Sequence, residues 1–217
     1  MHLQEIEKKI TNMDVKSEFI SKKDGRITTI FESLYVLKKF APNKVHKNEW
    51  VIEYDVIAHL KNNNVLAPSC YGYRIDNSGA YLFKEYVPGQ PLENYTKETA
   101  LQLALMFSKF HATGVVTCDA HNDNVIQTLG GELLFIDFGK AIIFKKKNLL
   151  FYFKAAREIF FIKTKIIKDN VTYQDFLKSY IALQPDKQRR ILRTFFAGCN
   201  SILHLRENFR QKYKKSK

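Results

Sequence analysis

The feature that most constrains the fold is a change of pattern at Pro88-Gly89. Before this break, short apolar and β-branched runs alternate with polar turns, which predicts five short strands. They cover residues 15–20, 27–31, 34–38, 69–74 and 81–86. One helix is predicted among them, over residues 46–62, because its apolar residues recur at three- and four-residue steps. The first part of the chain therefore predicts a small antiparallel sheet with one helix.

After the break the pattern is mainly helical. Helices are predicted over residues 99–111, 150–167, 173–184 and 186–212, with a short strand at 133–138. With 45% apolar and 26% charged residues in a chain of 217, the composition favours a folded core and excludes intrinsic disorder. We therefore predict a two-lobed α+β fold with an N-lobe over residues 1–87, a C-lobe over residues 88–217 and a hinge near residues 85–90.

The expected location is the cytoplasm. Cys70, Cys118 and Cys199 are widely separated and form no CxxC pair, which argues against a disulfide framework or a zinc site. No apolar run reaches the length needed to cross a bilayer, and the first residues have no signal-peptide core.

The charge is unevenly distributed along the chain. The net charge is +13, and residues 140–217 alone hold 20 basic and 5 acidic residues. This asymmetry indicates an anionic partner: a nucleic acid, a phosphorylated substrate or an acidic lipid surface. The alternative is a solvated basic face with no specific partner.

Two polar segments carry the candidate chemistry. In the first, CDAHNDN at 118–124, the carboxylate of Asp119 lies five residues before the carboxamide of Asn124. In the second, Asp137 ends a short apolar strand and is followed by Phe138-Gly139. These residues could bring a general base and two hard oxygen ligands together, as magnesium–phosphate chemistry requires.

In order and spacing these segments resemble the protein-kinase-like fold. Asp119 and Asn124 match the catalytic loop HRDxxxxN, and Asp137-Phe138-Gly139 matches DFG. Upstream, VLK at 36–38 resembles the V-A-I-K strand, residues 53–60 resemble the helix with the ion-pairing Glu, and FKEYVPG at 83–89 resembles the hinge. The match covers residues 15–140.

The resemblance implies an ATP:alcohol phosphotransferase that uses Mg²⁺. Asp119 would be the catalytic base, and Asn124 and Asp137 would bind the metal. Nucleotide would be bound by four residues, of which the lysine would contact the phosphates and the hinge residues the adenine. They are Lys38, Glu53, Glu85 and Val87. Lys39 and Glu49 are alternatives to Lys38 and Glu53.

Three departures from the protein kinases bear on the substrate. The first turn contains a single glycine, Gly25, so residues 22–28 would cover the phosphates. Thr117 and Cys118 replace the His and Arg of HRD, and His121 is expected to support the loop. No APE motif follows the DFG, which favours a small or glycan acceptor over a peptide.

A short kinase-like chain with a basic helical end resembles the bacterial kinases that phosphorylate a heptose or Kdo sugar of the lipopolysaccharide core. This resemblance implies an anionic glycolipid acceptor and peripheral attachment to the inner face of the inner membrane. Basic and aromatic residues interleave over residues 145–168, as suits an anionic lipid surface.

Three different functions remain open: a compact atypical kinase or ATPase of tRNA modification, a small-molecule kinase, and a pseudokinase scaffold. They leave open whether the basic third binds membrane, substrate or RNA. The sugar, the hydroxyl and the oligomeric state are not predicted.

Overall fold

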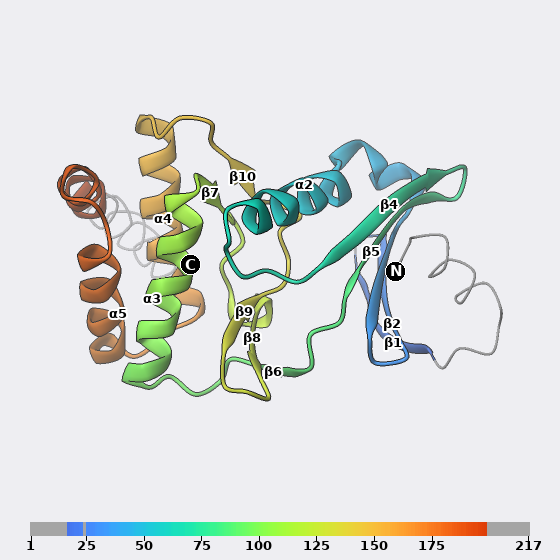
Figure 1. The fold of residues 1–217 in the computed structure, drawn as a ribbon, viewed down its shortest axis with the longest axis horizontal. Helices are drawn as coiled ribbons and strands as arrows, with labels where there is room; N and C mark the ends of the chain where they lie inside the picture. The colour runs from blue at the N-terminus through green and yellow to red at the C-terminus, as the bar shows by residue number, and fades with distance from the viewer. Residues whose placement is uncertain (1–16, 24, 199–217) are drawn as a thin grey trace, which may run out of the picture. The chain divides into compact units, whose positions relative to one another are not determined.

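The computed structural model describes residues 17–23 and 25–198. The chain divides into two compact units (Figure 1). Unit 1 comprises Met1–Leu92 and Asp123–Ile142, and unit 2 comprises Glu93–Asn122 and Ile143–Lys217. The predicted division was into consecutive pieces, 1–87 and 88–217. The structure instead groups the segment 123–142 with the N-terminal part, because its strands pair with the chain just after Pro88.

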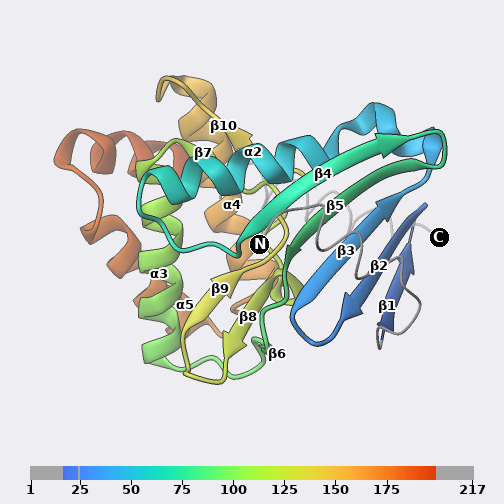
Figure 2. The same cartoon turned by 45° about the vertical axis from the view of Figure 1, so that its right-hand side comes forward.

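Unit 1 contains a five-stranded antiparallel sheet with the strand order β1-β2-β3-β5-β4 (Figure 2). Its strands are β1 (Ser17–Lys23), β2 (Arg26–Phe31), β3 (Tyr35–Phe40), β4 (Cys70–Asp76) and β5 (Gly79–Glu85). The predicted turn between β2 and β3 has positive φ at both Glu32 and Ser33, which suits the twist of a tight hairpin. The five predicted strands are therefore present; residues 15 and 16 of the first lie outside the described residues.

Helix α2 (Glu49–Asn62) runs along this sheet and contacts β4 and β5 (Figure 2). It starts three residues later than predicted, because Pro42–Lys47 forms a separate 3-10 helix, and its C-cap Asn48 has a φ of +53°. Trp50 of α2 packs with Phe40 and Leu82 of the sheet in a buried cluster. This packing fixes which face of α2, and therefore which of its side chains, points to the sheet.

A second, three-stranded sheet of unit 1 consists of β6 (Gly89–Pro91), β8 (Val125–Thr128) and β9 (Leu133–Phe135), in the order β6-β8-β9. The predicted strand 133–138 ends early, at Phe135. Beyond it the chain turns, because a carboxylate oxygen of Asp137 accepts a hydrogen bond from the Gly139 amide at 3.2 Å. The DFG segment is therefore a turn at the end of a strand.

Unit 2 is mainly helical. Its elements are α3 (Lys97–Ala112), β7 (Val115–Val116), α4 (Leu149–Lys165), α5 (Asn170–Ala182) and a helix over residues 186–198; β10 (Ile142–Ile143) lies where the units meet along the chain. α5 begins three residues earlier than predicted, because the Asp169 side chain caps the amide of Thr172 at 2.7 Å. Residues 199–212 of the last predicted helix lie outside the described residues. No helix in the described part of the chain has the length and apolar character needed to span a bilayer.

The turn between β4 and β5 generates a stability prediction. Gly79 has φ +134°, and a Cβ there would lie 2.0 Å from the Phe40 carbonyl oxygen. We expect Gly79→Ala to lower the free energy of unfolding by more than about 3 kcal/mol, because strain and a backbone clash combine. Gly131→Ala is the matched control: φ is +82° but nothing lies within 4 Å, so about 1 kcal/mol is expected. Equal losses in denaturant unfolding of the two variants would contradict the clash.

Candidate active site

Strand β3 and helix α2 bring together the lysine and glutamate that the sequence singled out. The Lys38 ammonium donates to both Glu53 carboxylate oxygens, at 2.9 and 2.7 Å, and both residues are buried. Burial alone would lower the pKa of Lys38, but nearby carboxylates outweigh it and raise the pKa. Lys39, one residue along, instead has its ammonium 5.3 Å from the centre of the Tyr81 ring. Of the two candidate lysines, the geometry therefore pairs Lys38 with Glu53.

A second buried ammonium contacts the same glutamate. Lys84 of β5 donates to Glu53 Oε1 at 2.7 Å and to the backbone carbonyl of Ile136. Burial lowers the pKa of Lys84, although the Glu53 carboxylate opposes this effect. The hinge-like motif at 83–89 contains Lys84 but does not predict this contact.

Asp137 lies beside the same cluster. Its Oδ1 is 3.1 Å from Lys38 Nζ, and its Oδ2 accepts a hydrogen bond from Arg26 at 3.3 Å. Burial would raise the pKa of Asp137, but the cations of Lys38 and Arg26 outweigh it and hold the pKa well below its usual range. Arg26 also lies 3.9 Å from Glu49, so this alternative glutamate faces the arginine rather than the Lys38 pair. Asp137 therefore remains ionised at neutral pH.

The β8–β9 ladder carries Asn124 and Asp137 at the same end. Val125 pairs with Phe135, and the Ile136 amide donates to the Asn124 carbonyl at 2.9 Å. Asn124 is therefore beside the residue that precedes Asp137. The described residues contain no group of three or more His, Cys, Asp or Glu side chains placed to hold a metal. An ionised carboxylate with one amide fits Mg²⁺, which typically takes one or two protein ligands and completes its shell with phosphate and water.

The two predicted hinge residues follow β5 directly. The Glu85 amide donates to the Ser69 carbonyl at 2.8 Å, and the Glu85 carboxylate accepts from the Ser69 amide at 2.7 Å. Ser69 therefore engages both the amide and the carboxylate of Glu85. Val87, two residues on, is half-buried.

The predicted catalytic aspartate belongs to unit 2 and lies five residues before Asn124 in the chain. Asp119 follows β7 in an irregular segment, and its carboxylate lies 3.7 Å from His121 Nε2. The expectation that His121 supports the loop agrees with this contact. Both side chains remain partly exposed, with exposed fractions of 27% and 33%.

A buried glutamate of α4, which the sequence analysis missed, fixes the chain just before Asp119. Glu158 Oε1 accepts hydrogen bonds from the Thr117 hydroxyl at 2.5 Å and from the Cys118 amide at 2.7 Å. Its Oε2 lies 2.8 Å from His111 Nε2, and His111 Nδ1 lies 2.6 Å from the Tyr180 hydroxyl. The Thr117 hydroxyl thus donates its hydrogen bond to a neighbouring helix, α4.

The backbone of Cys118 is held in a conformation that residues other than glycine rarely adopt. Its φ is +59°, in the left-handed region, where a residue with a Cβ is strained. The bond from its amide to Glu158 compensates for part of this strain. Burial raises the pKa of the Cys118 thiol to about 11, which agrees with a non-nucleophilic role. Cys70 and Cys118 are both free thiols, and Cys199 lies outside the described residues.

The two buried charged residues that were missed, Lys84 and Glu158, each leave a signal in the sequence. In β5, Ala80, Leu82 and Lys84 alternate on the buried face, so Lys84 stands where an apolar residue is expected. In α4, Glu158 lies among the buried positions Ala155, Ile159 and Ile162. A charged residue at an apolar position of a regular pattern indicates a buried ionic partner.

Comparison of the sequence with models of known protein families and with curated proteins finds no match. Solved structures do match. Aminoglycoside phosphotransferase APH(2'')-Ib bound to ADP is 12% identical, with a TM-score of 0.61 over 90% of this chain and 86% of that one. A GDP complex of aminoglycoside 2'-phosphotransferase-IIIa is 12% identical, with a TM-score of 0.62 over 97% and 90%.

WbdD is 15% identical, with a TM-score of 0.51 over 83% of this chain and 50% of that one. These similarities, at such low identity, establish the fold. The α+β protein-kinase-like fold predicted from the motifs is confirmed.

The contacts of Glu158 with Thr117, Cys118 and His111, here called the anchor on α4, generate a second stability prediction. Glu158→Gln replaces one acceptor oxygen by an NH₂ group, so Thr117, Cys118 or His111 loses its partner. We expect the free energy of unfolding to fall by about 1–3 kcal/mol in denaturant titration. Asp186→Asn is the control, since Asp186 is 86% exposed in a surface pair with Arg189, and a change below about 0.5 kcal/mol is expected. A loss in Glu158→Gln no larger than in the control would show that the anchor contributes little.

Proposed function

We propose that the protein is an ATP-dependent phosphotransferase that phosphorylates a sugar hydroxyl, a heptose or Kdo residue, of the lipopolysaccharide core. One observation carries the phosphotransferase assignment: a buried Lys38–Glu53 ion pair whose ammonium also lies 3.1 Å from Asp137. This arrangement places a fixed cation beside an ionised carboxylate, as binding of a metal–triphosphate requires. The ADP and GDP in structures of the same fold support a nucleotide substrate.

Four residues of unit 1 would hold the nucleotide. Lys38 would contact the α- and β-phosphates, and Glu53 would keep its ammonium in place. The backbone at Glu85 and Val87 would bind the adenine base. Arg26, now paired with Asp137 at 3.3 Å, is a further cation near the phosphates in this scheme.

Asn124 and Asp137 would hold Mg²⁺ through an amide oxygen and a carboxylate oxygen. When bound, the metal neutralises charge on the β- and γ-phosphates. The low pKa of Asp137 keeps this carboxylate available as a ligand over the whole physiological pH range. Neither residue needs to lose a proton for this role.

Asp119 would accept a hydrogen bond from the acceptor hydroxyl and take its proton as the phosphoryl group is transferred. Glu158 would act through the backbone: it fixes Thr117 and Cys118, the two residues directly before Asp119. The strained φ of Cys118 agrees with a backbone that is set for function rather than for stability.

The charge of the C-terminal third supports an anionic acceptor. Residues 140–217 carry a net charge of +15, which suits a phosphorylated glycolipid and disfavours a cationic one. In this proposal the protein acts in the cytoplasm, at the inner face of the inner membrane.

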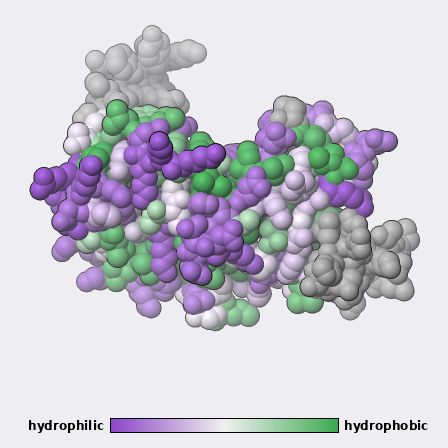
Figure 3. Space-filling view, turned by 45° about the horizontal axis from the view of Figure 1, so that its top comes forward, coloured by the Kyte–Doolittle hydropathy of each residue, from purple (hydrophilic) through white to green (hydrophobic). Residues whose placement is uncertain are grey.

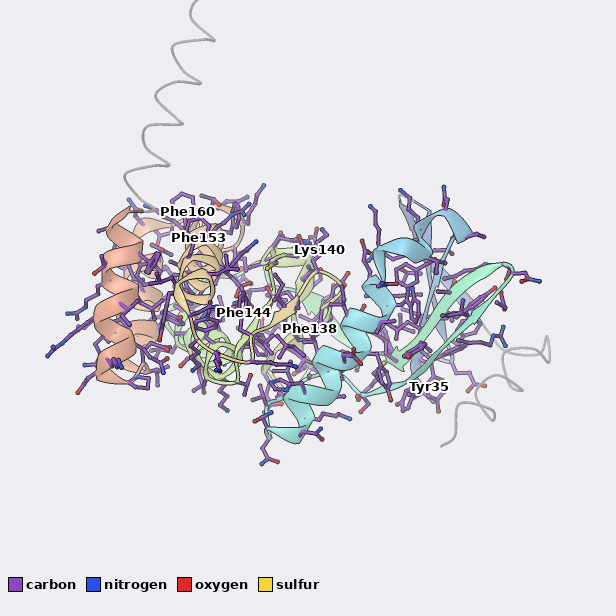
Figure 4. All side chains as sticks on the ribbon, turned by 90° about the horizontal axis from the view of Figure 1, so that it is seen from above. Tyr35, Phe138, Lys140, Phe144, Phe153 and Phe160 are labelled. Carbon is purple, nitrogen blue, oxygen red and sulfur yellow. The ribbon has the colours of Figure 1, made fainter. Side chains whose placement is uncertain are left out.

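The exposed side of α4 gives this proposal a candidate lipid-facing surface. Leu149, Leu150 and Phe153 are 73%, 54% and 40% exposed, and Lys145, Lys146 and Arg157 are exposed beside them in the sequence. Figure 4 shows Phe153 and Phe160 on α4, and Figure 3 shows hydrophobic side chains intermingled with hydrophilic ones on the helical unit. Apolar and basic side chains together favour adsorption to an anionic leaflet.

A small-molecule kinase is the second candidate, favoured by the similarity to aminoglycoside phosphotransferases. Aminoglycosides are cationic, so the strong positive charge of this chain argues against such an acceptor. A tRNA-directed enzyme and a pseudokinase scaffold are weaker candidates. The five residues Lys38, Glu53, Asp119, Asn124 and Asp137 are all present, which favours turnover over a scaffold.

The catalytic assignment predicts that Asp119→Asn retains the fold but loses phosphoryl transfer by roughly 10²–10⁴-fold, because the base is gone and the shape is nearly unchanged. The measurement is Mg²⁺-dependent transfer from ATP to purified lipopolysaccharide core, with thermal unfolding as the control for folding. Transfer at the wild-type rate would exclude Asp119 as the base.

Mass spectrometry of the glycolipid from a deletion strain tests the acceptor. One core phosphate should be missing, and the wild-type gene but not Asp119→Asn should restore it. An unaltered glycolipid with ATP-dependent activity in vitro would reject the acceptor and keep the kinase assignment.

The lipid-facing surface predicts that Lys145→Gln combined with Lys146→Gln weakens binding to anionic vesicles by up to about 30-fold at low salt, and less as salt rises. Nucleotide affinity should not change. Lys147 is left intact, because it is half-buried and contacts Gln188 and the Phe151 ring.

Lys178→Gln with Lys187→Gln is the matched control for this experiment. Both lysines are exposed, and the change in net charge is the same. Vesicle sedimentation across a salt series compares the two variants. Equal losses would assign the binding to net charge alone.

A further inference from the structure

The Glu53 carboxylate holds two ammonium groups in a site where a single lysine would satisfy it. Its Oε1 accepts from Lys38 at 2.9 Å and from Lys84 at 2.7 Å, while Oε2 accepts only from Lys38 among the described residues. Glu53 and Lys84 side chains are 1% and 4% exposed. Burying a second charge in such a place is costly, so its hydrogen-bonded partners must compensate for the lost hydration.

The register of the sheet puts the two lysines on one face. Leu82 of β5 lies directly opposite Lys38 of β3, and Lys84 is two residues from Leu82. Residues opposite each other, and residues two apart on one strand, share a face, so Lys38 and Lys84 are diagonal neighbours. The side chains of Lys38 and Lys84 can therefore both reach Glu53 of α2 from the same side of the sheet.

Lys84 also makes a contact that Lys38 does not. Its ammonium donates to the carbonyl of Ile136, the residue immediately before Asp137. The amide of Ile136 donates in turn to the Asn124 carbonyl. Lys84 thus joins three segments through one nitrogen: strand β5, helix α2 and the backbone that carries the proposed metal ligands.

The charges in this cluster explain why two cations are useful. Lys38, Lys84 and Arg26 face only two carboxylates at contact distance among the described residues, Glu53 and Asp137, apart from the longer 3.9 Å approach of Glu49. With Lys84 beside Glu53, that glutamate keeps a counter-charge even when Lys38 turns part of its interaction to a phosphate. Glu53 then has no need to move as nucleotide binds.

We infer that Lys84 is a positioning residue: it fixes Glu53 and the Ile136 peptide, and so holds Lys38 and Asp137 in place for a metal–nucleotide complex. This role rests on the proposed phosphotransferase function. The contacts of Lys84 with Glu53 and the Ile136 carbonyl, here called the clamp, already join α2 to the segment 133–139 in the ligand-free protein.

Hydrogen exchange of the ligand-free protein tests the clamp itself. In Lys84→Met, amides of α2 and of residues 133–139 should exchange about 10–100-fold faster, because each loses a buried charged hydrogen bond. Lys84→Arg, which retains the charge and several donors, should restore most of the protection. Lys39→Met is the control: it lies on the same sheet, contacts the Tyr81 ring and should leave both segments unchanged.

Nucleotide titration then tests the consequence. Lys84→Met should weaken ADP binding about tenfold with Mg²⁺ present and less with a chelator, because the loss through Asp137 needs the metal, whereas a loss through Lys38 does not. A merely structural residue would lower thermal stability and leave the ratio of the two affinities unchanged. If Lys84→Met does not fold, Lys84→Gln replaces it. Its neutral amide can donate to one acceptor but lacks the charge, so the same pattern with a smaller effect is expected.

The outcomes separate this inference from the proposed function. Wild-type exchange in α2 and 133–139 of Lys84→Met, or equal acceleration over the whole chain, would overturn the clamp. Wild-type protein that binds ADP under neither condition would reject the proposed function and, with it, the role of the clamp toward nucleotide. Altered exchange together with an unchanged Mg²⁺ dependence would likewise overturn that role.

Discussion

The structure of unit 1 depends on one buried carboxylate. Glu53 is fully buried on α2 and receives ammonium groups from two different strands, β3 and β5. An unpaired carboxylate in this position would be strongly destabilising, so the sheet, the helix and the segment before Asp137 are constrained to one arrangement. Hydrophobic packing of Trp50 against Phe40 and Leu82 brings the helix to the sheet, and the ionic contacts then determine its position along it.

Unit 2 also contains a buried carboxylate that organises the residues around it. Glu158 is also a buried carboxylate, but its partners include backbone as well as side chains, and they lie next to the proposed base. A charged acceptor forms stronger hydrogen bonds than a neutral one, which is what a strained residue such as Cys118 requires. In each unit, therefore, one acidic side chain and its partners fix the backbone next to a residue with a proposed role, Asp137 or Asp119.

Much of the fold could be predicted from the sequence, because the strands, helices and turns depend on local patterns. The order of the motifs also indicated the kinase-like fold and the pairing of Lys38 with Glu53, whose partners are 15 residues apart. Lys84 and Glu158 were missed because their contacts join residues 31 and 40 positions apart, across different elements. Such contacts follow from register and helix packing, which short-range periodicity does not specify. The contact of Arg26 with Asp137, 111 positions apart, was missed for the same reason.

The discontinuity of unit 1 has a consequence for how the chain is made. Strands β8 and β9 belong to the same unit as residues 1–92, but 30 residues of unit 2 are synthesised before them. During translation, β6 cannot pair until β8 has been synthesised, and Lys84 cannot donate to the Ile136 carbonyl until that residue has been synthesised. The N-terminal sheet can therefore form early, but its ionic centre can be completed only once residue 136 has left the ribosome. A nascent chain that stalls before that point would present two lysines and one glutamate without the backbone that completes their network.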